Sequence, residues 1–142
     1  MKSLSTTKST LAMSIGLVML ALTTVSNPAH AEQAPNFIQE TFPQQGVDSA
    51  WESYQSVFFG ADAVLDGKTK ELMALAVSAQ VPCDYCIYYH TRAAHAHGAT
   101  DAEVREALAV AGLIRKWSTV LNGAQYDSEQ WQREVDAMFS GD

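Results

Sequence analysis

The sequence predicts an all-α fold, and three observations lead to this prediction. Apolar residues recur at steps of three and four residues in most of the chain beyond position 47, which is the spacing of an amphipathic helix. Capping patterns open two of these segments. No segment alternates apolar and polar residues in the manner of a half-buried strand.

The first 31 residues indicate a cleaved secretory signal peptide. Two lysines stand in a polar opening, residues 11–25 are mostly apolar, and residues 29–31 place small side chains where a signal peptidase cleaves. The apolar run is shorter than the roughly 20 residues that span a bilayer, which disfavours an uncleaved anchor. We therefore expect an exported, periplasmic protein whose mature chain begins at Glu32.

The mature chain is predicted to hold an N-terminal arm, residues 32–46, and one helical domain, residues 47–142. The arm contains two prolines and several glutamines, and we expect it to be extended or packed on a neighbour. Five helices are expected in the domain, the second of them buried because it is apolar on nearly every side, with a possible further turn of helix at residues 62–67. The five are expected at residues 48–59, 68–80, 82–97, 101–121 and 128–139.

The residues at the ends of these segments support the helix boundaries. Gly98 suits the left-handed conformation that closes a helix. Thr100 is followed three residues later by Glu103, which is a capping-box pattern, and Asp127 stands in the same way before Gln130.

Composition limits the possible partners. The formal net charge is −7 and the chain has no basic cluster, so we expect neither nucleic acid nor an anionic membrane surface as a partner. The length of the mature chain fits one domain. Its two cysteines would enter an oxidising compartment, where a disulfide can form.

The cysteines, Cys83 and Cys86, are followed by His90, and helical periodicity places all three on one face. Cys83 stands at the predicted helix N-terminus, where free N–H groups favour a thiolate. Cys86 has His90 four residues further on, and this imidazole can act as its base. These arguments favour different cysteines, so the nucleophile stays open. Either way, one thiolate can attack an oxidant and the other can resolve the product as a disulfide.

Other readings of the pair are weaker. A two-residue spacer closes almost no loop, so a purely stabilising disulfide is weakly motivated. A structural zinc site needs four ligands, which His95 or His97 would have to complete from further along the same helix; both are otherwise expected at the surface. Covalent haem needs a histidine directly after the second cysteine, where Ile87 stands.

The pattern around the pair resembles the alkyl hydroperoxidase D (carboxymuconolactone decarboxylase-like) family over roughly residues 65–112. Its residue types and spacings are more specific than a cysteine pair alone. They are Glu71, Cys83-Asp84-Tyr85-Cys86, His90, and the run from Ala94 through Gly98-Ala99-Thr100 to Glu103 and Glu106.

The resemblance implies an all-α domain that forms homo-oligomers, often trimers or hexamers, and that reduces peroxides without a cofactor or metal. Cys86 would be the peroxidatic thiolate and Cys83 the resolving partner. Glu71 and His90 would form a proton relay, through water. Family peroxidases commonly carry a histidine where this chain has Tyr85, which can either donate a hydrogen bond to a sulfur or only line the pocket.

The leading hypothesis is therefore a thiol-dependent peroxidase of (alkyl) hydroperoxides, serving antioxidant defence in an exported compartment. The family's electron donor is a cytoplasmic lipoyl-bearing adaptor, which an exported protein would not meet, so the reductant is an unidentified thiol protein or small thiol. One alternative is a thiol-disulfide oxidoreductase acting on exported proteins. Another is a non-catalytic, oligomeric helical binding module with an inert disulfide.

Overall fold

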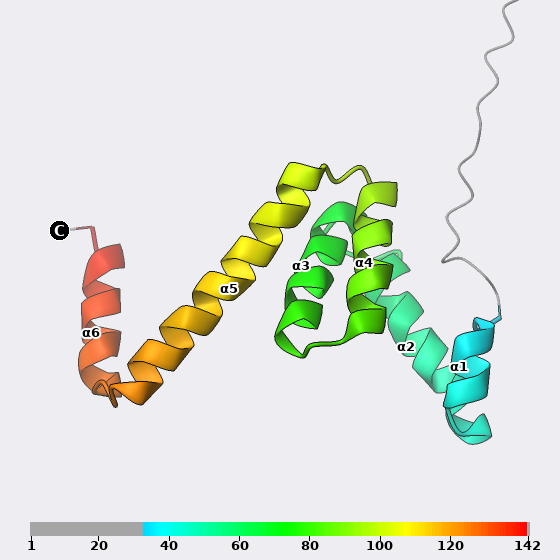
Figure 1. The fold of residues 1–142 in the computed structure, drawn as a ribbon, viewed down its shortest axis with the longest axis horizontal. Helices are drawn as coiled ribbons and strands as arrows, with labels where there is room; N and C mark the ends of the chain where they lie inside the picture. Colours follow the sequence, from blue (N-terminus) through cyan, green and yellow to red (C-terminus); the bar gives the residue numbers. More distant parts are fainter. Residues whose placement is uncertain (1–32, 142) are drawn as a thin grey trace, which may run out of the picture.

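The computed structural model describes residues 33–141, so the predicted signal peptide lies outside the described residues. Within them the chain forms six α-helices, one short 3₁₀ helix and no strand, which confirms the all-α prediction (Figure 1). In chain order they are α1 (Asn36–Thr41), η2 (Gln44–Gly46), α2 (Val47–Phe59), α3 (Gly67–Gln80), α4 (Asp84–Ala96), α5 (Asp101–Gly123) and α6 (Ser128–Phe139).

Helices α3 and α4 form the centre of the fold as a hairpin, and α5 packs on the other side of α3 (Figure 1). Leu75 of α3 and Ala94 of α4 are completely buried in this unit. The burial of α3 agrees with its apolar sequence, which leaves few polar positions to face water.

Close approach of α3 and α4 depends on a glycine. A Cβ atom added to Gly67 would lie 2.5 Å from Nδ1 of His97, far inside van der Waals contact. The start of α3 therefore packs directly on the imidazole at the C-terminal end of α4. His97 is half-buried here, although the sequence suggested a surface position.

Capping interactions begin α5 and α6 where the sequence predicted them. Thr100 and Glu103 form both hydrogen bonds of the capping box, and Asp127 accepts from the backbone N–H of Gln130. Gly98 follows the C-terminus of α4 with a φ of +84°, a conformation that glycine adopts without steric cost.

Two expectations for segments outside the five predicted helices differ from the structure. Residues 62–66 are the end of a turn and an irregular segment, and α3 begins only at Gly67, because Asp66 stays extended and its carboxylate caps α3 at Thr69. The N-terminal arm is not extended, since it contains α1 and η2. It folds back because Ile38 is buried against Val47 and Trp51, which removes apolar surface from water.

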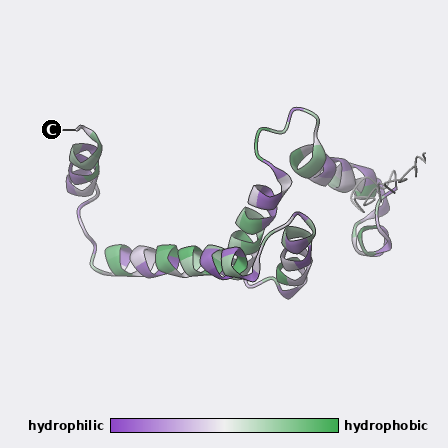
Figure 2. Ribbon diagram, turned by 90° about the horizontal axis from the view of Figure 1, so that it is seen from above, coloured by the Kyte–Doolittle hydropathy of each residue, from purple (hydrophilic) through white to green (hydrophobic). Residues whose placement is uncertain are grey.

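The outer part of α5 and the whole of α6 lie apart from the α3–α4 hairpin (Figure 1). Arg115 of α5 donates to the side chain of Gln80 at 2.6 Å and to its backbone carbonyl at 2.8 Å, which fixes α5 to the end of α3. Beyond this point α5 runs away from the centre and α6 turns back at its outer end (Figure 1), and hydrophobic and hydrophilic residues are interspersed along α5 (Figure 2). None of the helices in the described residues combines the length and apolar character needed to cross a membrane.

Candidate redox site

A disulfide joins Cys83 and Cys86 at the start of α4, with their Cα atoms 5.3 Å apart. Both residues are partly exposed. Cys83 is the N-cap of the helix, and its sulfur accepts a hydrogen bond from the backbone N–H of Cys86 at 3.2 Å. The sulfurs are therefore held beside each other where solvent reaches them.

The helix begins later than the sequence indicated. We predicted that Pro82 opens it, but Cys83 is extended and α4 begins at Asp84. The backbone N–H of Cys83 donates to the carbonyl of Ser78 at 3.1 Å, which keeps the residue outside the helix. Cys86 consequently lies in the first turn, near the positive end of the helix dipole. The backbone N–H bonded to its sulfur favours a thiolate at Cys83, whereas the histidine one turn further on favours Cys86, so the two arguments still point to different cysteines.

Glu71 and His90 meet across the α3–α4 hairpin, which the sequence left open. Nδ1 of His90 lies 2.6 Å from Oε2 of Glu71. The Glu71 side chain is 1% exposed and that of His90 13%. Since a carboxylate accepts, Nδ1 carries the proton in this contact, and in the neutral form of the ring that tautomer leaves Nε2 free as a base. The pair therefore orients an imidazole one helical turn from Cys86.

Aromatic side chains of α2 and α4 surround this imidazole. Phe58 stacks on the ring of His90 with centroids 5.6 Å apart, and Tyr89 meets it edge-on at 5.1 Å. The hydroxyl of Tyr54 donates to that of Tyr89 at 2.9 Å. Burial, this hydrogen bond and the charge of Glu71 raise the pKa of Tyr54 well above its ordinary value, so it stays a neutral donor.

The sequence did not predict that these aromatic residues contact His90. From the sequence we interpreted Phe58 and Tyr54 only as the apolar face of a helix, and Tyr89 as a packing residue. The spacing of aromatic residues along α2 was a signal, but the contact of that face with His90 depends on how α2 folds back over α4.

Tyr85, between the cysteines, is 90% exposed. It therefore projects from the surface beside the disulfide. The two other histidines near the end of α4 have structural partners: His95 bonds the carbonyl of Ala99 at 2.9 Å, and His97, the residue after the helix, packs on Gly67. Among residues 33–141 no group of three or more His, Cys, Asp or Glu side chains is placed to hold a metal ion.

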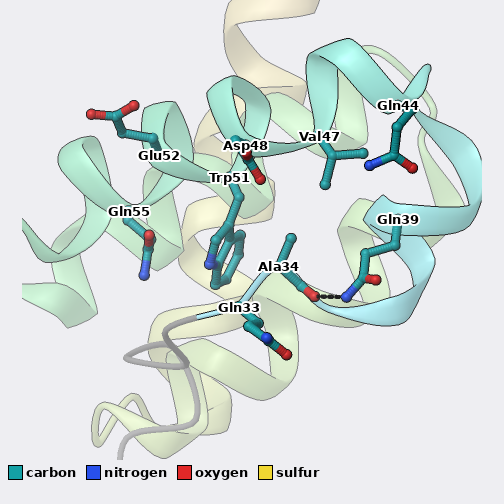
Figure 3. Close-up of a pocket in the computed structure, with 9 residues that line it drawn as sticks. All are labelled: Gln33, Ala34, Gln39, Gln44, Val47, Asp48, Trp51, Glu52 and Gln55. Atoms are coloured by element: carbon teal, nitrogen blue, oxygen red, sulfur yellow. Dashed lines mark hydrogen bonds between the residues drawn. The ribbon is translucent and has the colours of Figure 1, made fainter.

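A cavity of about 390 Å³ lies between the N-terminal segment and α2 (Figure 3). Its lining is mostly polar and includes four glutamines and two carboxylates, with Trp51 between them. The lining residues are Gln33, Ala34, Gln39, Gln44, Val47, Asp48, Trp51, Glu52 and Gln55. Neither cysteine, His90 nor Glu71 belongs to this lining, so the cavity is separate from the redox site.

Comparison with known proteins identifies the family of the chain. Residues 45–129 match the model of the carboxymuconolactone decarboxylase family, which is more than half of the chain. The protein belongs to this family. The match includes α2 to α5 and therefore the whole of the candidate site.

A solved structure that resembles the chain is that of the alkylhydroperoxidase AhpD core from Rhodospirillum rubrum. The two are 34% identical with a TM-score of 0.55, over 61% of this chain and 63% of that one. Uncharacterised protein 4 in the cox locus of Paracoccus denitrificans is 39% identical over 69 residues, which is 49% of this chain and 61% of the relative. An uncharacterised protein of Cupriavidus necator is 37% identical over 46% of this chain and 60% of its own length. The chain thus spans less than two thirds of each relative.

Proposed function

We propose that the protein is a thiol-dependent peroxidase that reduces hydroperoxides through a dithiol–disulfide cycle of Cys83 and Cys86. The observation that carries the proposal is the buried Glu71–His90 pair, which orients a base one helical turn from Cys86. Membership of the family and likeness to an alkylhydroperoxidase core support it. The partial exposure of both cysteines also supports it, because substrate and reductant must reach the sulfurs.

The cycle begins with the reduced dithiol. His90 removes the proton of the Cys86 thiol, and the thiolate attacks the terminal oxygen of a hydroperoxide ROOH. The O–O bond breaks, ROH leaves with the proton returned by His90, and Cys86 becomes a sulfenic acid. The thiol of Cys83 then attacks this sulfur, water leaves, and the disulfide forms. A dithiol donor returns two electrons and two protons and restores both thiols.

Glu71 has a supporting role in this scheme. Its carboxylate accepts from Nδ1 of His90 and stabilises the imidazolium that forms when the thiol is deprotonated. Because Glu71 is buried, little water screens this interaction. The pair therefore favours the state in which Cys86 is a thiolate.

The direct test is peroxide consumption by the pre-reduced protein. Cumene hydroperoxide should be consumed in a one-to-one ratio with the Cys83–Cys86 disulfide, measured by mass spectrometry. Cys86→Ser should abolish the reaction, whereas Cys83→Ser should accumulate a sulfenic acid that dimedone traps. If Cys86→Ser consumes peroxide as fast as the parent protein, the proposal is wrong.

A second candidate function is disulfide exchange with exported proteins. The observation that favours it is the exposure of Tyr85 and Tyr88, which flank the disulfide and present aromatic surface to a protein substrate. This function predicts rapid mixed-disulfide formation with an unfolded thiol protein and little consumption of peroxide. A reduction potential in the range of protein oxidants would favour it over the peroxidase.

A further inference from the structure

The imidazole of His90 is held by more than its hydrogen bond to Glu71. One hydrogen bond to Nδ1 resists rotation of the ring about χ1 and χ2 only from the side of Glu71. Phe58 restricts the same motion from the face of the ring, because its own ring lies nearly parallel to the imidazole, 21° apart in plane and 5.6 Å between centroids. Tyr89 meets the same ring edge-on at 89°. Both are favourable aromatic geometries.

Helix α2, which carries Phe58, is itself fastened at this point. The ammonium of Lys70 on α3 donates to the carbonyl of Val57 at 2.5 Å and to that of Phe58 at 3.4 Å. Tyr54 stacks on Phe58 with centroids 4.5 Å apart and binds Tyr89 through its hydroxyl. The end of α2 is thus tied to both helices that contribute to the redox site.

We propose that Phe58 is a positioning residue for the redox site: stacked on His90, it holds the imidazole in the plane in which Nε2 serves the thiol of Cys86. The inference rests on the proposed role of His90 as a base, but it does not require that peroxide is the substrate. The ionisable groups that face the ring from the packed helices are Glu71 of α3 and the hydroxyls of Tyr54 and Tyr89. Phe58 itself does not titrate, so it acts only through the orientation of His90.

The test measures the reactivity of Cys86 without peroxide. The full chain carries Cys83→Ser, so that Cys86 alone reacts, and serine preserves the N-cap of α4 because it is a favoured capping residue. The rate of alkylation of Cys86 by iodoacetamide is followed from acidic to alkaline pH. Phe58→Leu removes the aromatic ring and keeps an apolar side chain, Phe58→Tyr keeps the ring, and Phe37→Leu repeats the change at an exposed position on α1.

We expect Phe58→Leu to slow alkylation at neutral pH by about threefold to tenfold, the range carried by one aromatic pair. Phe58→Tyr and Phe37→Leu should leave the rate unchanged. In a His90→Asn background Phe58→Leu should have no further effect, since the residue acts through His90. An unchanged rate, or an equal loss in both backgrounds, would overturn the inference.

If Phe58→Leu does not fold, a second variant can test whether the end of α2 positions His90. Lys70→Met leaves the ring of Phe58 in place and removes the hydrogen bonds that fasten the end of α2. It should slow the same reaction, and this effect should also vanish in the His90→Asn background. If the peroxidase proposal is wrong, the protein will not consume peroxide, but Cys86 will still be alkylated at the normal rate. The two outcomes are therefore distinguishable.

Discussion

The residue that matters most to the proposed chemistry is a carboxylate with almost no solvent exposure. Glu71 is fully buried on α3, where an unpaired charge is very costly. Its contact with Nδ1 of His90 offsets that cost and selects the tautomer with a free Nε2. One hydrogen bond thus satisfies a requirement of folding and a requirement of the proposed reaction.

Substitutions at this pair should distinguish the contribution of His90 as a base from that of the Glu71 charge. His90→Asn removes the base, and we expect the second-order rate with cumene hydroperoxide at neutral pH to fall by about a hundredfold or more. Glu71→Gln keeps an acceptor for Nδ1 but removes the charge that stabilises the imidazolium, so its loss should be smaller. Stopped-flow measurement on the reduced protein gives both rates.

His95→Asn is the matched control, because His95 is exposed and lies on the same helix. Its rate should equal that of the parent protein. A rate for His90→Asn within twofold of the parent would contradict the assigned role of the imidazole.

At the scale of the helices, one charged pair links α3 and α5. The ammonium of Lys68 on α3 lies 2.7 Å from the carboxylate of Glu103 on α5. This ammonium, together with the N–H and hydroxyl of Thr100, lowers the pKa of Glu103 from 4.5 to about 2. The carboxylate is therefore held in its charged form in the folded state.

Stability should consequently fall as the pH is lowered across this range. A carboxyl whose pKa is lower in the folded than in the unfolded state stabilises the protein above pH 4.5, and this contribution is lost as the pH falls toward 2. In Glu103→Gln this part of the pH dependence should be absent, which urea unfolding at several pH values measures. Glu106→Gln, an exposed neighbour on α5, should keep the pH dependence of the parent. Parallel curves for parent and Glu103→Gln would refute the interpretation.

The spacing between α3 and α4 gives a second prediction for the helices. Alanine normally stabilises a helix relative to glycine, but Gly67→Ala would drive a methyl group into the imidazole of His97. We expect a loss of about 1–3 kcal/mol in the free energy of unfolding, as for other overpacked sites.

Two comparisons isolate the clash. Gly123→Ala at the end of α5, where no atom lies within 4 Å of the added Cβ, should be neutral or stabilising. The double variant Gly67→Ala/His97→Ala should recover most of the loss, because the ring that obstructs the methyl group is gone. A double variant as unstable as Gly67→Ala would place the cause elsewhere.

At the scale of the whole molecule, the sequence predicted correctly those features that are determined by residues close to one another in the chain. The capping box at Thr100 and the cap at Asp127 each involve residues three apart, so they were legible without a structure. The start of α4 was misplaced, because the bond that holds Cys83 outside the helix comes from Ser78 of α3. The stack of Phe58 on His90 joins two separate helices, and no local pattern encodes it.

Local sequence patterns also do not show how copies of the chain would associate. The family resemblance led us to expect a homo-oligomer. The outer part of α5 carries apolar residues that are half or more exposed, and α6 packs extensively on no other helix of the described residues. The exposed apolar residues of this outer part are Leu113, Ile114, Trp117 and Val120. An apolar surface of this kind usually marks an interface between proteins. We expect other copies of the chain to cover it in a closed homo-oligomer, a trimer or a hexamer.

Ile114→Glu tests this assembly, because it places a charge in the exposed apolar stretch of α5, where a partner copy would have to bury it unpaired. Sedimentation velocity should show the parent as a multiple of the single chain and this variant as a smaller species. Val64→Glu makes the same change at a residue that is 96% exposed in the segment between α2 and α3, so it should leave the parent's sedimentation unchanged. A parent that sediments as one chain would mean that α5 and α6 are covered by something other than a second copy. Equal oligomers for parent and Ile114→Glu would place the interface away from this part of α5.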